Sequence, residues 1–145
     1  MYRSLQHLSQ FPFLFFFFVS LILRLFPLSL ADVGTGAYYD PPYLPTECYG
    51  TDTSQFPANN LFAAAGEGIW DNGASCGREY LVRCLSAAAP NACIDGQTIQ
   101  IMIVDYVDSL NSSPSRNGTT MILSSNAFAM IADQSAAEIN IEFQQ

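Results

Sequence analysis

The side chain best placed for chemistry in this sequence is the carboxylate of Asp105. Ile99, Ile101 and Ile103 alternate with other residues just before it, so they share one face of a β-strand, and by parity Asp105 lies on that face. A carboxyl at the end of an apolar face is partly desolvated, which raises its pKa and suits it to proton transfer. An equally good interpretation is a buried aspartate whose oxygens accept backbone N–H groups at a strand end.

The rest of the composition excludes most other chemistries. The chain of 145 residues has no lysine and a single histidine, His7, and all 13 acidic residues follow Ala31. Three arginines oppose them there, so the net charge of that part is 3 − 13 = −10, which disfavours nucleic acids and anionic membranes. Without a histidine in that part, serine–histidine and cysteine–histidine catalysis and histidine-ligated zinc are excluded. We expect no metal and no cofactor.

The first 31 residues have the three parts of a secretory signal peptide. An arginine and the amino terminus supply a positive start, Phe13 to Leu23 form an apolar run, and Ser29-Leu30-Ala31 places small residues at the −3 and −1 positions of a cleavage site. A membrane anchor would need about 20 apolar residues, but Arg24 ends this run after 11 residues. The sequence therefore predicts a signal peptide over residues 1–31, a mature domain over residues 32–145, and no stable membrane insertion.

Secretion into an oxidising compartment makes disulfides the expected state of the four cysteines, Cys48, Cys76, Cys84 and Cys93. Four cysteines allow three pairings, and their spacing does not choose between them. No Cys-x-x-Cys pair is present, so structural cross-links are favoured over a metal site or a redox-active pair.

Two N-glycosylation sequons occur in the polar stretch 108–120, which also predicts a secreted glycoprotein. They begin at Asn111 and Asn117. Pro114 directly follows the first sequon, so Asn117 is the better acceptor of the two.

Short β-rich segments divided by turn-forming residues carry these side chains. We expect strands over residues 35–39, 61–65, 80–85, 98–107, 119–123 and 139–143. Short helices are expected over residues 66–71 and 125–132, the second because Phe128, Ile131 and Ala132 fall on one face and a serine can cap its start. The pattern predicts an all-β single domain, a small barrel or a sandwich.

Four ordered blocks then resemble a known family. They read GTGAYY at residues 34–39, IWDNGASCG at 69–77, IVDY at 103–106 and AFAMIA at 127–132. Over residues 33–143 the chain resembles the plant natriuretic peptides and blight-associated proteins, secreted relatives of the expansin N-terminal domain, which is itself similar to family 45 endoglucanases. The resemblance implies a six-stranded double-psi β-barrel with one or two short helices, located in the apoplast and monomeric.

The resemblance also implies a cysteine pairing. Relatives carry six cysteines, and here Val107 stands where the fifth would be, while the sixth is also missing. The family order then implies the pairs Cys48–Cys76 and Cys84–Cys93.

A second departure from the family concerns catalysis. Asp105 matches the first barrel acid of relatives, but Ile122 occupies the place of the second, because Met-Ile-Leu-Ser replaces their Ile-Asp-Leu-Ser. Glycoside cleavage ordinarily uses two carboxylates. We therefore expect no catalytic residue and no enzyme, with Asp105 left as a candidate acid of the barrel groove.

Two functions follow from the resemblance. The first is non-enzymatic signalling in water and solute homeostasis or stress response, with a cell-surface receptor as partner. The alternative is a module that binds or loosens cell-wall polysaccharide without hydrolysis. Tyr38, Tyr39, Tyr43 and Trp70 could then offer aromatic faces to sugar rings, although core and turn packing is the other interpretation of these residues.

Overall fold

The computed structural model describes residues 16, 18–19, 30–110 and 118–145. Most of the expected signal peptide, and the sequon residues Asn111 and Asn117, lie outside the described residues. The chain divides into two compact units, Met1–Leu30 and Ala31–Gln145, and the second unit holds the barrel and the functional site. No helix within the described ranges is long and apolar enough to cross a membrane.

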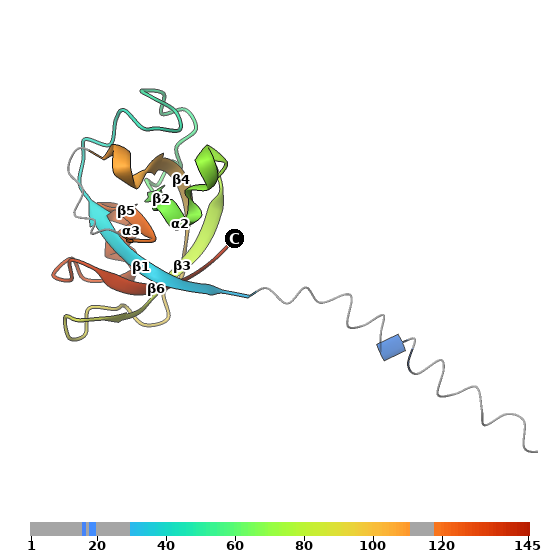
Figure 1. The fold of residues 1–145 in the computed structure, drawn as a ribbon. Coiled ribbons are helices and arrows are strands. Elements are labelled where there is room, and N and C mark those ends of the chain that lie inside the picture. The colour runs from blue at the N-terminus through green and yellow to red at the C-terminus, as the bar shows by residue number, and fades with distance from the viewer. Residues whose placement is uncertain (1–15, 17, 20–29, 111–117) are drawn as a thin grey trace, which may run out of the picture. The chain divides into compact units, whose positions relative to one another are not determined.

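Six strands form a closed barrel (Figure 1). They are β1 (Asp32–Tyr39), β2 (Phe62–Ala65), β3 (Glu79–Ala87), β4 (Ile99–Tyr106), β5 (Met121–Ser124) and β6 (Ile139–Gln144). Around the barrel their order is β1-β5-β2-β4-β3-β6. The pairs β1–β5 and β2–β4 are parallel and the other four are antiparallel. This confirms the expected six-stranded all-β barrel, with each strand at its expected place in the sequence.

Short helices fill two of the connections. Helix α2 (Glu67–Trp70) follows β2 and continues into the 3-10 turn η1 (Asp71–Gly73), and a second 3-10 turn, η2 (Val107–Ser109), follows β4. Helix α3 (Ser125–Ile131) follows β5 directly. Both expected helices are therefore present, and α3 buries the face that contains Phe128 and Ile131.

Two apolar clusters lie on opposite faces of the strands, because side chains alternate along each strand. The interior cluster fills the barrel and includes Ile101, Ile103, Leu123 and Ile141 together with Phe128 of α3. The outer cluster lies on the other face of β1, β5, β2 and β4 and continues into η2; it consists of Ala37, Tyr39, Phe62, Ala64, Val104, Val107 and Ile122. The segment 40–61 covers the outer cluster with Tyr43, Tyr49 and Phe56.

Two disulfides secure the connections. The bond Cys48–Cys76 joins the covering segment to the turn that follows η1, and the bond Cys84–Cys93 joins β3 to the loop after it. These are the pairs that the resemblance implied. Each closes a loop in the unfolded chain and so stabilises the folded barrel.

The side chain of Ser124 links β5, α3 and the covering segment. It is fully buried, and its Oγ accepts a hydrogen bond from the N–H of Ala127 (3.2 Å) and donates to the carbonyl of Asn60 (2.5 Å). We expect Ser124→Ala to lower the free energy of unfolding by about 1–3 kcal/mol, because the buried N–H of Ala127 and the partly buried carbonyl of Asn60 each lose a hydrogen bond. Urea denaturation measures the effect.

Ser86→Ala provides the matched control, because Ser86 is exposed and accepts one hydrogen bond from the side chain of Asn140. Its urea midpoint should lie close to that of the unmodified protein. Equal midpoints for the two serine variants would contradict the role assigned to Ser124.

Candidate functional site

Asp105 does not lie on the face that strand alternation predicted. The pairing of β2 with β4 shifts between Ala63 and Ala64, so that Ala63 opposes Ile103 but Ala64 opposes Asp105. A β-bulge of this kind places one extra residue, here Val104, in the strand and reverses the parity that comes after it. Asp105 therefore leaves the barrel interior and lies on the side of the outer cluster, which corrects the prediction.

The carboxylate of Asp105 is enclosed there. The residue is 1% exposed, and its Oδ1 accepts hydrogen bonds from the backbone N–H groups of Glu47 and Tyr106, each at 2.8 Å. The neighbouring Cys48 N–H also reaches the carbonyl of Val104 (3.3 Å). These hydrogen bonds link the covering segment to the end of β4. They match the interpretation of Asp105 as a buried aspartate whose oxygens accept backbone N–H groups.

Ile122 lies two strands away from Asp105, on the same side of the sheet. Both residues oppose Ala64, one from β5 and the other from β4. Two strand spacings amount to about 10 Å, close to the range of about 6.5–9.5 Å that separates the carboxylates of inverting glycosidases. In this chain the position across Ala64 from Asp105 is Ile122, which is fully buried in the outer cluster. It makes apolar contacts where a glycosidase would need a second carboxylate.

Tyr39 adds a neutral hydroxyl beside Asp105. It is 5% exposed, and its hydroxyl has no hydrogen-bond partner among the described residues. Burial raises the pKa of this phenol, and the charges of Asp105 and Tyr43 raise it further. The phenol is therefore protonated at physiological pH.

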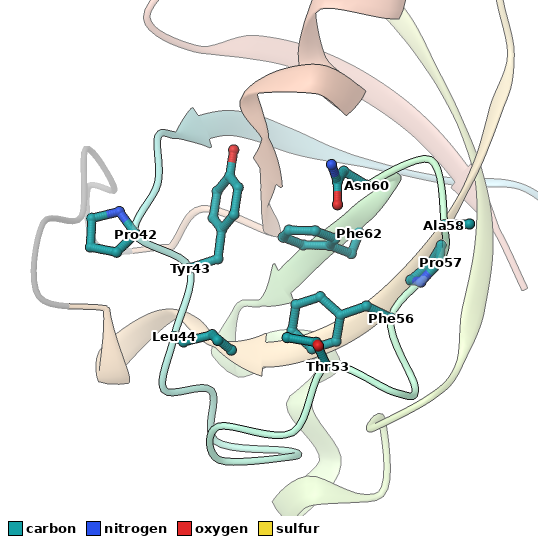
Figure 2. A pocket seen from close by; sticks show the side chains of 9 residues that line it. All are labelled: Pro42, Tyr43, Leu44, Thr53, Phe56, Pro57, Ala58, Asn60 and Phe62. Carbon is teal, nitrogen blue, oxygen red and sulfur yellow. The ribbon is translucent and has the colours of Figure 1, made fainter.

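A pocket of about 560 Å³ opens between the covering segment and the outer cluster (Figure 2). Phe62 is fully buried, and the rings of Tyr43 and Phe56 approach it with centroids 4.8 Å and 5.0 Å away. Leu44 contributes an aliphatic wall, and within the described part of the chain no charged side chain lines the pocket. The arrangement can hold a ring-shaped ligand against aromatic edges.

The hydroxyl of Tyr43 holds this wall in place. It is hydrogen-bonded to Oγ of Ser125 at 2.8 Å and accepts the N–H of the same residue at 3.3 Å. The ring also contacts Tyr39, with centroids 4.9 Å apart. The pocket wall is thereby tied to the start of α3.

A second aromatic surface is formed by residues outside this pocket. Trp70 of α2 stacks on Tyr106 of β4 with centroids 4.7 Å apart and 20° between the ring planes. The hydroxyl of Tyr106 is hydrogen-bonded to the carboxylates of Glu67 and Asp108. The hydrogen bond to Glu67 is the main reason why the pKa of this phenol is raised, followed by desolvation and by Asp108.

The structure therefore separates the four aromatic residues that the sequence suggested as sugar contacts. Tyr38 packs on Phe128 at 4.8 Å between centroids, and its hydroxyl donates to the carbonyl of Gln134. Tyr39 is buried and Tyr43 lines the pocket. Trp70 alone of the four belongs to the stack with Tyr106, so the four do not form one binding face.

Sequence reasoning missed four residues that shape these surfaces, namely Leu44, Phe56 and Phe62 at the pocket and Tyr106 in the stack. A signal for the first two was present, because Leu44 and Phe56 are large apolar residues within a segment rich in turn-forming residues. Such residues need apolar cover, and here Phe56 packs against Phe62, while Leu44 stays partly exposed at the pocket.

Comparison with known proteins adds the family. A family model described as lytic transglycolase matches residues 63–143, more than half of the chain. A Citrus jambhiri protein described as "EG45-like domain containing protein" is 36% identical over 118 residues, which cover 79% of this chain and 82% of the relative. The chain belongs to the EG45-like domain family. The Arabidopsis thaliana protein "EG45-like domain containing protein 2" is likewise 36% identical over 119 residues, with 81% and 82% of the two chains covered.

Solved structures show the same barrel in expansins. The apo expansin of Clavibacter michiganensis aligns with a TM-score of 0.56 and 16% identity, and a mutant of it in complex with cellohexaose aligns with 0.58 and 16%. In each case the match covers 80% of this EG45-like chain and 50% of the expansin, so the chain spans about half of the expansin's length. The expected expansin-like, double-psi β-barrel is thereby confirmed.

Proposed function

We propose that this EG45-like protein acts by binding and does not cleave glycosidic bonds. The observation that carries the proposal is the pair of positions on either side of Ala64. One is Asp105, which is enclosed and bonded to two backbone N–H groups, and the other is Ile122, which is apolar and buried. Hydrolysis ordinarily needs an acid and a base or nucleophile on the two sides of the scissile bond, and this arrangement offers one carboxylate without access to solvent.

A reducing-sugar assay on soluble glucan tests this point. We expect no release above that of a heat-denatured sample, and the same result for Asp105→Asn. Release by the unmodified protein that disappears in Asp105→Asn, with both proteins folded by circular dichroism, would contradict the proposal. A family 45 endoglucanase assayed in parallel shows that the substrate is cleavable.

The favoured role of this binding is signalling in the apoplast. We propose that residues 1–31 are removed, that the domain 32–145 is secreted as a monomer and glycosylated, and that it reaches a cell-surface receptor that controls water and solute balance. The two disulfides support an oxidising compartment. The resemblance of the chain to natriuretic-type proteins supports the role itself.

Swelling of mesophyll protoplasts exposed to purified residues 32–145 measures the signalling role. We expect a change in volume that depends on protein concentration. Reduced and alkylated protein serves as control, because loss of the disulfides should unfold it. No volume change at any concentration would eliminate the role.

The second candidate is binding of cell-wall polysaccharide. The stacked rings of Trp70 and Tyr106 favour it, since both are partly exposed and aromatic residues commonly contact apolar ring faces. The expansin of similar fold is known in complex with cellohexaose. Retention on insoluble cellulose separates the candidates: binding should fall in Trp70→Ala and persist in Ile94→Ala, an exposed apolar residue elsewhere. Absence of retention would leave signalling as the role.

A further inference from the structure

We infer that the pocket beside Phe62 is a binding site for a small, neutral, largely apolar ring compound of the phenol class. This inference is independent of the proposed function, because the Trp70–Tyr106 stack is formed by other residues. The pocket volume of about 560 Å³ lies within the range of about 300–1,000 Å³ that is usual for small-molecule sites.

The walls select an aromatic or aliphatic ring. The buried ring of Phe62 forms the base of the pocket, and Tyr43 meets it edge-on, with 88° between the ring planes. Phe56 contacts Phe62 at an interplanar angle of 59°, and Leu44, which is 38% exposed, stands at the rim. The partly exposed rings of Tyr43 and Phe56 present ring faces and edges that favour a further aromatic group over a polar one.

The polar groups are too few for a sugar. Thr53 and Asn60 are the polar lining side chains other than Tyr43 among the described residues, and the hydroxyl of Tyr43 is already bonded to Ser125. A sugar ring carries a hydroxyl on most of its carbons, and each hydroxyl placed in an apolar pocket without a partner costs binding free energy. Figure 2 shows Asn60 beside Phe62 and Thr53 beside Phe56, so the polar side chains are few and lie apart, which suits a ligand with a single hydroxyl group.

Charge excludes an ionised ligand. Within the ranges that the structure describes, no lysine, arginine, aspartate or glutamate lines the pocket, so a charged ligand would lose hydration without gaining a counter-ion. The part of the chain after Ala31 carries a net charge of −10 from 13 acids and three arginines, which further disfavours an anion. A neutral phenol fits these features, because its ring can pack on the apolar walls, its hydroxyl can bond to Thr53 or Asn60, and it carries no charge.

The test uses 2-naphthol as the probe and 6-hydroxy-2-naphthoate as its anionic counterpart. The protein is produced in a secreting eukaryotic host, so that both disulfides form, and is titrated by calorimetry and by methyl and side-chain amide NMR. We expect saturable one-to-one binding of 2-naphthol, with shifts at Leu44 and Asn60, and binding of the anion that is weaker by about tenfold or more.

Leu44→Ala and Leu85→Ala form a matched pair of variants. Both leucines are similarly exposed, at 38% and 41%, so both variants should fold, but Leu85 lies on β3 outside the pocket. We expect Leu44→Ala to weaken 2-naphthol binding roughly fivefold, which is the loss of one or two buried methylene groups, and Leu85→Ala to leave it unchanged.

Four outcomes would overturn the inference. The first is the absence of saturable binding up to about 1 mM. The second is equal binding of 2-naphthol by the two leucine variants. The third is displacement of 2-naphthol by cellohexaose, which would assign the pocket to a sugar. The fourth is concentration-dependent dimerisation in sedimentation velocity that Leu44→Ala abolishes, since the occupant would then be a second copy of the chain.

Discussion

Gly66→Ala is expected to lower the free energy of unfolding by about 3 kcal/mol or more and the melting temperature by roughly 10 °C or more. Gly66 follows β2, and its N–H donates to the carbonyl of Thr120 at 2.9 Å. A Cβ atom on Gly66 would lie 2.0 Å from the carbonyl oxygen of Thr119 and 2.9 Å from that of Thr120. Both contacts are to backbone atoms, so the barrel must distort to accept a methyl group.

Gly68→Ala is the matched control two residues away. Gly68 lies within α2, and nothing stands within 4 Å of a Cβ atom placed on it. Alanine there should raise the free energy of unfolding by about 0.4–1 kcal/mol, because it restricts the unfolded chain and favours helix. Thermal unfolding followed by circular dichroism compares the two variants, and similar melting temperatures would show that the approach of Gly66 to Thr119 is not tight.

Ile122→Asp, which introduces the acid that the resemblance implies at this position, is expected to destabilise the protein by about 4 kcal/mol or more and to produce no hydrolase. Ile122 is fully buried, and it pairs with Ala37 of β1 and Ala64 of β2. An aspartate there loses the apolar contacts of the outer cluster, and its carboxyl is desolvated near Asp105, which carries the same charge. Adding this one carboxyl group is therefore not expected to create a working pair of catalytic carboxylates with Asp105.

A series at position 122 separates packing from charge. Ile122→Val should cost about 0.5–1.5 kcal/mol, Ile122→Asn more, and Ile122→Asp most at pH 7. The difference in the free energy of unfolding between the Asp and Asn variants should shrink as the pH falls to about 4. Desolvation raises the pKa of a buried carboxyl above its value in the unfolded chain, so ionisation favours unfolding only at higher pH. Urea denaturation at both pH values measures this difference. An Asp variant as stable as the Val variant would show that the surroundings of residue 122 are polar.

The positions of the strands could be predicted from the sequence because turn-forming residues divide the chain at each connection. The expected strand at 139–143 is found as β6 (Ile139–Gln144), and the expected helix at 125–132 as α3 (Ser125–Ile131). The apolar spacing of Phe128 and Ile131 was sufficient for α3, since both residues belong to the interior cluster. Local sequence patterns predict a helix or strand well when one of its faces packs against a single hydrophobic core.

The side of the sheet that Asp105 faces could not be predicted. Alternation placed it with Ile103, but the bulge beside Ala64 reverses the parity after that residue. The bulge results from how β2 and β4 pair, and these strands lie far apart in the sequence. A register shift between distant strands leaves no local periodic signal.

The sequence did not predict which aromatic residues are accessible to a ligand, for a related reason. Tyr38 and Tyr39 are neighbours in β1, yet they belong to opposite faces, and Tyr39 is covered by Tyr43 from the following segment. Residue type suggested that they were available to a sugar. Which aromatic residues remain accessible depends on how the segment 40–61 folds over the outer cluster, and that segment contains no regular strand or helix.

The barrel order also determines when the protein can fold during its synthesis. Among the described strands β1 pairs with β5 and β6, and its first residue, Asp32, lies opposite Phe143, close to residue 145. Synthesis proceeds at about 5–20 residues per second, so β1 stays unpaired for several seconds while the middle of the chain emerges. The Cys48–Cys76 and Cys84–Cys93 bonds span 28 and 9 positions, so both can form before β1 finds its neighbours. Among the described strands, closure of the barrel through β1 therefore follows the synthesis of β5 and β6, and a chain stopped before Met121 would contain both cysteine pairs but neither neighbour of β1.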